Sequence, residues 1–145
     1  MKKYPLFVLA MLCTRFADAA ETPVVSAAAC WIRAVPDGGA AYFTLSNPSD
    51  KAVTLTEVEV EGYGMAMLHE SKNVGGMMKM SDVDEVPVPA HGSVSFAPGA
   101  YHVMLMNEKK PPVIGKNLQL SLKFRDAPAV TAACVVKTPD AIEAK

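Results

Sequence analysis

The stretch 101-YHVMLMN-107 decides the fold, because its residues alternate between two kinds of side chain. Its first, third and fifth residues are Tyr, Val and Leu, whereas the intervening ones are His102, Met104 and Met106. Successive side chains of a β-strand point to opposite faces of the sheet. The first set therefore suits an apolar core, and the second places imidazole and thioether groups on the other face.

Short alternating segments separated by Pro, Gly, Asn and Asp continue on both sides of this stretch. The run Asn47-Pro48-Ser49-Asp50 is one of the strong turn signals between them. No segment shows the apolar period of about 3.6 residues that indicates an amphipathic helix. The pattern predicts one all-β domain, a sandwich or barrel of about nine or ten strands. The expected strands are 24–33, 41–46, 53–60, 65–70, 77–81, 86–88, 93–96, 101–107, 118–125 and 130–137.

The first twenty residues have the features of a secretory signal. Lys2 and Lys3 give a positive start, an apolar core follows, and Ala17-Asp18-Ala19 is a small-residue cleavage site. The apolar core is about ten residues long, whereas a membrane-spanning helix needs about twenty. We expect a signal peptide over residues 1–19, cleavage after Ala19, and a mature domain over residues 20–145 in the periplasm.

The composition excludes several classes of function. The chain has 14 Lys and Arg against 15 Asp and Glu, and it has no basic patch that would indicate a nucleic-acid partner. No apolar run after the leader is long enough to cross a membrane. The motifs G-x-S-x-G, H-E-x-x-H, the P-loop and C-x-x-C-H do not occur, so we expect no enzyme activity. We expect a monomer.

Two cysteines, Cys30 and Cys134, remain after the leader, which contains Cys13. An exported chain meets an oxidising compartment, where a pair of cysteines usually forms a disulfide. Each lies in an expected strand, so the bridge would join the first strand to the last. A redox-active pair is the alternative, although no C-x-x-C motif favours it. For Cys13, the bulky Leu12 before it argues against a lipid anchor.

Seven of the nine methionines lie between Met65 and Met106, in the same region as His69 and His102. Thioether sulfur and neutral imidazole together favour a soft monovalent metal, of which Cu(I) is the physiological candidate. Methionine also fills irregular cores, which is the alternative explanation. The residues from Leu118 onward contain many apolar positions and no methionine, so use as core filler does not account for the clustering.

Strand periodicity places these groups on shared faces. In 65–69 the two methionines share a face with His69, and in 77–80 the residue Met80 shares a face with Met78. If the fold brings these segments beside 101–107, a four-ligand site forms without distorting any strand. The remaining methionines are better suited to the wall of the site than to metal binding, and His91 reads as a solvated turn residue. Those methionines are Met65, Met67, Met77, Met78 and Met106.

The pattern His69–x10–Met80–x21–His102–x–Met104 resembles the signature of the periplasmic CuA chaperone family, PCu(A)C. The flanking runs Gly76-Met77-Met78-Lys79-Met80 and Pro98–Met106 resemble that family too, as does Trp31-Ile32-Arg33. The resemblance covers nearly all of the chain after the leader. It implies a cupredoxin-like Greek-key β-sandwich that binds one Cu(I) through His69, Met80, His102 and Met104. It also implies copper delivery to the CuA site of cytochrome c oxidase, on subunit II, alongside a Sco-type protein.

Three other functions compete with delivery. A periplasmic copper buffer or resistance protein would use the same ligands. A thiol–disulfide redox protein would use Cys30 and Cys134. An electron-transfer cupredoxin would need a Cys thiolate beside two His, and neither cysteine lies in the ligand segments.

Overall fold

Ten β-strands are the only regular elements in residues 24–141, the part of the chain that the computed structural model describes. The expected signal peptide over 1–19 lies outside the described residues. The number and order of the strands confirm the expected all-β domain. The strands are β1 (Ser26–Val35), β2 (Gly38–Asn47), β3 (Val53–Val60), β4 (Tyr63–Val74), β5 (Met77–Asp82), β6 (Val86–Val88), β7 (Gly92–Phe96), β8 (Tyr101–Glu108), β9 (Asn117–Phe124) and β10 (Val130–Lys137).

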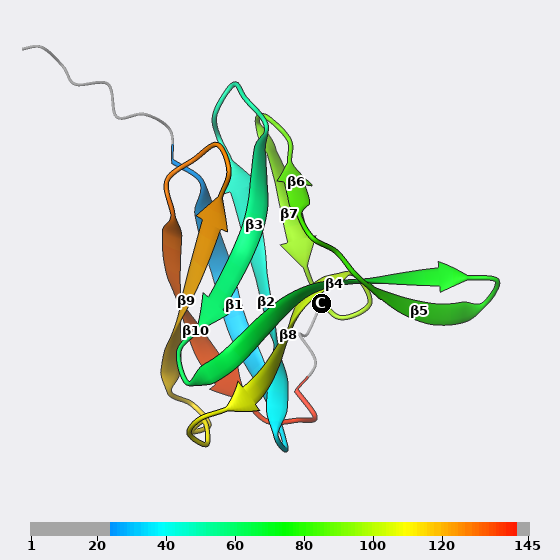
Figure 1. The fold of residues 1–145 in the computed structure, drawn as a ribbon, viewed down its shortest axis with the longest axis vertical. Helices are drawn as coiled ribbons and strands as arrows, with labels where there is room; N and C mark the ends of the chain where they lie inside the picture. Colours follow the sequence, from blue (N-terminus) through cyan, green and yellow to red (C-terminus); the bar gives the residue numbers. More distant parts are fainter. Residues whose placement is uncertain (1–23, 142–145) are drawn as a thin grey trace, which may run out of the picture.

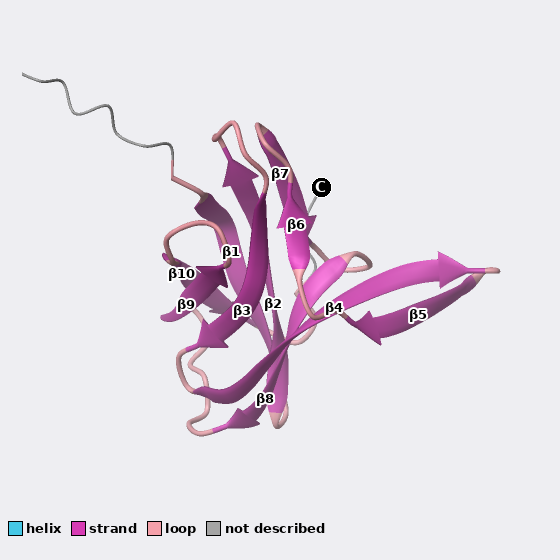
Figure 2. Cartoon of the chain, turned by 45° about the horizontal axis from the view of Figure 1, so that its top comes forward, coloured by secondary structure: helices cyan, strands magenta, loops and turns pink. Residues whose placement is uncertain are grey.

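The strands form one continuous sheet in the order β5-β4-β8-β7-β2-β1-β10-β9-β3-β6, with an additional pairing between β8 and β2. Neighbouring strands are antiparallel except for β1 with β10 and β7 with β8. The sheet curls over so that its two halves enclose a core, as Figures 1 and 2 show. Many neighbours in the sheet are not consecutive in the chain, as Greek-key connections require.

The core lies between the two halves of this curled sheet. Phe43 of β2 stacks on Phe96 of β7 with ring centroids 4.4 Å apart. Val103 and Leu105 of β8 are almost fully buried in the same cluster, together with Leu68 of β4. The apolar face expected for 101–107 is therefore the core face. The imidazole and thioether face of β8 points away from the core.

Gly38 and Gly39 begin β2, three residues before the start of the strand expected over 41–46. Gly38 already pairs with Val35, so Pro36 and Asp37 alone form the turn, and Asp37 has φ 65°. A Cβ on Gly38 would lie 2.6 Å from the carbonyl oxygen of Leu105. Glycine is needed here because β8 approaches closely, and not because the chain turns.

The end of β4 and the whole of β5 form an arm that projects from the side of the sandwich (Figures 1 and 2). Every residue of β5 is exposed, and within the described sheet β5 is an edge strand that pairs only with β4. Gly75 and Gly76 join the two strands with φ values of 62° and 84°, as a two-residue type I′ turn requires. Val74 pairs with Met77 across this turn, so β4 runs four residues past its expected end at Glu70.

The structure joins Cys30 of β1 to Cys134 of β10, which are 104 residues apart in the chain. The two strands are parallel neighbours, and the two Cα atoms lie 4.5 Å apart. Cys134 is fully buried in the core, whereas Cys30 is half-buried. A bulge interrupts β1 beside the bridge, where Ala29 has a positive φ of 52°. The expected disulfide between the first and last strands is confirmed.

Candidate metal centre

His69 and His102 lie directly opposite each other on β4 and β8. Paired residues of antiparallel strands share a face, so both imidazoles project from the outer face of the sheet. Their ring centroids are 5.5 Å apart and the rings meet edge to face. Met67 pairs with Met104 on the same face, two residues further along the two strands. The register therefore places two of the three ligand-bearing segments, 65–69 and 101–107, side by side.

The ring nitrogens of His69 are buried, and neither makes a hydrogen bond to the described residues. Nε2 lies 2.9 Å from Oδ1 of Asp82, an ion-pair distance, but the contact lacks the geometry of a hydrogen bond. Buried polar atoms without a partner are rare in folded proteins. A bound metal ion would supply the missing partner, so the residues present fit a metal.

His102 is buried beside the same position, with only 5% of its surface exposed. Its Nδ1 lies 3.2 Å from the carbonyl oxygen of Ala100, to which it donates in the tautomer that carries the proton on Nδ1. That tautomer leaves the lone pair of Nε2 available to a metal. A hydrogen bond on one ring nitrogen is the usual way in which proteins orient a histidine ligand.

The aromatic ring of Tyr42 supports His102 from the β2 side. Their ring centroids are 6.5 Å apart, and Trp31 packs on the other side of Tyr42 at 4.5 Å. The guanidinium of Arg33 donates a 2.8 Å hydrogen bond to the hydroxyl of Tyr42. Trp31, Tyr42 and Ala40 form a second buried cluster on the outer face, separate from the main core. This cluster limits the orientations available to the His102 ring.

Burial lowers the pKa of His102 below its ordinary value of 6.5, because desolvation disfavours the charged ring. The hydrogen bond to Ala100 opposes this shift, whereas His69 and Arg33 add to it through their charges. The ring is therefore held in its neutral form. Only neutral imidazole binds a metal, so this environment prepares His102 for coordination.

The two methionines of the expected ligand set occupy different surroundings. Met104 is half-buried on β8, two residues from His102 on the same face. Met80 lies on the arm, opposite Ser71 of β4, and is 68% exposed. Because Ser71 and His69 share a face, Met80 lies on that face too, diagonal to His69. His69, His102 and Met104 thus gather on β4 and β8, whereas Met80 lies apart from them on the exposed strand β5.

Sequence reasoning missed two neighbours of the histidines. Asp82 pairs with His69 across β4 and β5, and Tyr42 packs near His102. Alternation within residues 65–69 already placed Met67, which pairs with Met104, on the ligand face. Asp82 and Tyr42 could not be found this way, because their positions depend on the register between strands. His91 is an exposed turn residue, as expected, with its Nε2 2.6 Å from Asp50.

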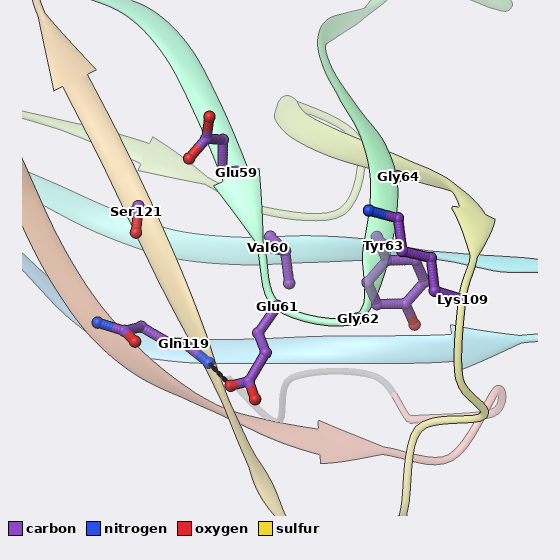
Figure 3. A pocket seen from close by; sticks show the side chains of 9 residues that line it. All are labelled: Glu59, Val60, Glu61, Gly62, Tyr63, Gly64, Lys109, Gln119 and Ser121. Atoms are coloured by element: carbon purple, nitrogen blue, oxygen red, sulfur yellow. Dashed lines mark hydrogen bonds between the residues drawn. The ribbon is translucent and has the colours of Figure 1, made fainter.

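A polar depression of about 450 Å³ lies near the turn between β3 and β4 (Figure 3). Within it, Oε2 of Glu61 accepts a 3.3 Å hydrogen bond from the backbone N–H of Gln119. No His, Met or Cys lines it, and Tyr63 at its rim is about 20 Å along β4 from His69. The depression therefore does not take part in the candidate metal centre. Its lining residues are Glu59, Val60, Glu61, Gly62, Tyr63, Gly64, Lys109, Gln119 and Ser121.

Two further observations apply to residues 24–141. No group of three or more His, Cys, Asp and Glu side chains is placed to hold a metal ion there. No helix in this part of the chain is long and apolar enough to cross a membrane.

Comparison with known proteins identifies the family. The family described as "Putative lipoprotein LpqE-like" matches residues 25–136. Protein RP573 of Rickettsia prowazekii is 32% identical over 88 residues, which are 60% of this chain and 49% of RP573. This chain therefore spans about half the length of that relative.

Solved structures resemble the whole sandwich. CuI-DR1885 from Deinococcus radiodurans is 32% identical with a TM-score of 0.62, covering 83% of this chain and 81% of that one. The apo PCuAC domain from PmoF1 is 26% identical with a TM-score of 0.69, and the match covers 82% of this chain and 98% of that domain. These matches confirm the cupredoxin-like Greek-key fold. Because the family model matches residues 25–136 and the structural neighbours include PCuAC domains, the chain belongs to the LpqE-like family, which is the PCuAC family.

Proposed function

We propose that this protein is an exported carrier of Cu(I) that delivers copper to the CuA site of cytochrome c oxidase. The ion is bound by His69, Met80, His102 and Met104. One observation carries the proposal: His69 and His102 face each other across β4 and β8, and the buried nitrogens of His69 make no hydrogen bond to the described residues. The Cu(I) form of DR1885, with 32% identity, supports the choice of metal.

The ligand chemistry suits a carrier in the periplasm. Thiols in an oxidising compartment are lost to disulfides, whereas thioethers are not. Thioethers also favour Cu(I) over harder divalent ions. Met80 is exposed on the arm, so the ligands of an acceptor can replace it first and reach the metal. The acceptors that we propose are cytochrome c oxidase subunit II and a Sco-type protein.

Anaerobic titration with Cu(I) against a competing chelator tests the site. We expect one tightly bound equivalent in the wild-type protein. The double variant Met80→Leu/Met104→Leu should bind that equivalent at least about tenfold more weakly, a loss of about 1.4 kcal/mol, because two of four ligands are gone. Leucine conserves the volume of methionine, so the fold should remain.

The matched control is Met77→Leu/Met78→Leu, which removes two exposed thioethers from the same arm and should bind like the wild type. Unchanged affinity in the Met80/Met104 variant would refute the site. Transfer is tested separately, by mixing the loaded protein with the CuA domain of subunit II. Tight binding without transfer would indicate a copper buffer in place of a delivery protein.

Copper affinity should depend on pH through the imidazoles, because thioethers carry no proton to exchange. Since burial holds the pKa of His102 below 6.5, this ring stays neutral at a pH where a free imidazole is half protonated. The part of the affinity loss that comes from His102 should therefore set in at a lower pH than it would for an unperturbed imidazole, and grow as the solution becomes more acidic. Measuring the apparent Kd from about pH 8 to about pH 5 checks this, since that range spans the titration of histidine. A flat profile would contradict coordination by histidine.

A further inference from the structure

Four methionines form two facing pairs beside the histidines. Met65 of β4 pairs with Met106 of β8, and Met67 pairs with Met104. Cβ atoms of directly opposed residues lie about 5 Å apart, and successive residues on one face of a strand lie about 7 Å apart. The four thioethers therefore occupy a small rectangle, and their flexible side chains let the sulfur atoms converge on one point.

These methionines do not fill the core. The alternate residues Ala66 and Leu105 pack into the core cluster, so the thioethers lie on the outer face. Met65 is 46% exposed, and the other three are half-buried. Use as core filler, which is the ordinary reason for clustered methionine, does not apply to this set.

The neighbouring strand carries only small residues beside the thioethers. On β2, Gly38 pairs with Met106 and Ala40 pairs with Met104. Gly38 has no side chain and could not carry one, because a Cβ would lie 2.6 Å from the carbonyl oxygen of Leu105. At the level of His102 the same strand carries the large ring of Tyr42. On the outer face, β2 thus carries small residues beside the methionine pairs and the ring of Tyr42 beside His102.

We propose that Met65, Met67, Met104 and Met106 form a second Cu(I) site made of thioethers alone. This inference rests on the proposed function, because it takes Met104 as a ligand shared with the histidine site. Soft sulfur donors select a soft monovalent ion, and no described acidic group lies among the four to attract a hard cation. Without an imidazole, this site binds Cu(I) more weakly than the histidine site.

The shared ligand makes the second site a step for entry and release. Cu(I) moves between the sites by ligand exchange, in which its bonds to the imidazole nitrogens break as bonds to Met67 and its neighbours form. The ion stays Cu(I) throughout, so no oxidant or reductant is needed.

Titration of the purified protein with Cu(I) or Ag(I), without oxygen, tests the second site. The wild type should bind two equivalents, the second more weakly, because Met104 stays with the first ion and Met65, Met67 and Met106 hold the second. In Met65→Leu/Met106→Leu the affinity for the second equivalent should fall at least tenfold while the first is unchanged. X-ray absorption should show nitrogen and sulfur around the first equivalent and sulfur alone around the second. The Met77→Leu/Met78→Leu control should bind both Cu(I) equivalents like the wild type.

The outcomes separate this inference from the proposed function. If wild type and Met65→Leu/Met106→Leu bind one tight equivalent identically, the second site is refuted and the histidine site stands. If the wild type binds no tight equivalent, the proposed function fails. His69→Ala/His102→Ala, shown to be folded by circular dichroism, should keep one weak, sulfur-only equivalent. Loss of all Cu(I) from that variant would overturn the second site.

Discussion

Replacing both His69 and His102 with alanine is expected to weaken the binding of the first Cu(I) equivalent by at least about 100-fold, or about 2.7 kcal/mol. The two imidazoles are the best-ordered donors of the proposed site, since they lie in register on adjacent strands with ring centroids 5.5 Å apart. The remaining donors are neutral thioethers, of which Met80 is largely exposed. Competition with a chelator of known affinity, at neutral pH and without oxygen, measures the loss.

The third histidine of the chain provides the matched control. His91 lies in a turn, contacts Asp50, and is exposed, so His91→Ala should leave the affinity unchanged. His102 is buried, and its removal leaves a cavity that lowers the free energy of unfolding. Thermal unfolding of the variant without metal must therefore show that it is folded at the temperature of the titration. A folded double variant that binds the first equivalent as tightly as the wild type would eliminate the histidine site.

Opening the bridge between Cys30 and Cys134 is expected to lower the free energy of unfolding by roughly 4–5 kcal/mol. The bridge closes a loop of 104 residues, and long loops restrict the unfolded chain most. A domain of this size is typically stable by only about 5–15 kcal/mol, so the loss is a large part of the total. Urea unfolding of the oxidised protein and of Cys30→Ala/Cys134→Ala measures it.

Alanine is the suitable replacement because Cys134 lies in the apolar core, where a serine hydroxyl would be buried without a partner. The variant should be insensitive to reducing agent, whereas the wild type should lose stability when it is reduced. At a temperature where the oxidised wild type and the double variant are both folded, they should bind copper with equal affinity, because neither cysteine lies on β4, β5 or β8. A bridge that a mild thiol reduces readily, with little change in stability, would favour a redox role for the pair.

Much of the fold could be predicted because local alternation determines it. The strands expected over 53–60, 86–88 and 130–137 have the bounds that the structure shows, since alternating apolar residues extend to the last or the next-to-last position of each. The end of β4 could not be predicted, because 71–73 are polar residues that pair with β5 on an arm outside the core. The strand expected over 41–46 begins three residues too late, because the constraint on Gly38, the approach of β8, comes from a distant part of the chain.

For the candidate site, the sequence likewise predicted the face on which each ligand lies, but not the residues that stand opposite one another. Alternation assigned His69, His102 and Met104 to ligand-bearing faces, and the structure places them together on the outer face of β4 and β8. Which residues stand opposite each other depends on register, which the sequence of a single strand does not contain. The contact of Asp82 with His69 and the packing of Tyr42 on His102 both follow from register.

The arm leaves the backbone hydrogen-bonding groups along one side of β5 open to a strand of another molecule. Such an open edge usually invites aggregation, and charged residues on it are a common protection. Lys79 stands on this strand directly opposite Lys72, so a second arm that paired here would bring further positive charge alongside. We expect this repulsion to oppose pairing between the exposed edges of two arms, which would leave the methionines of the arm open to solvent.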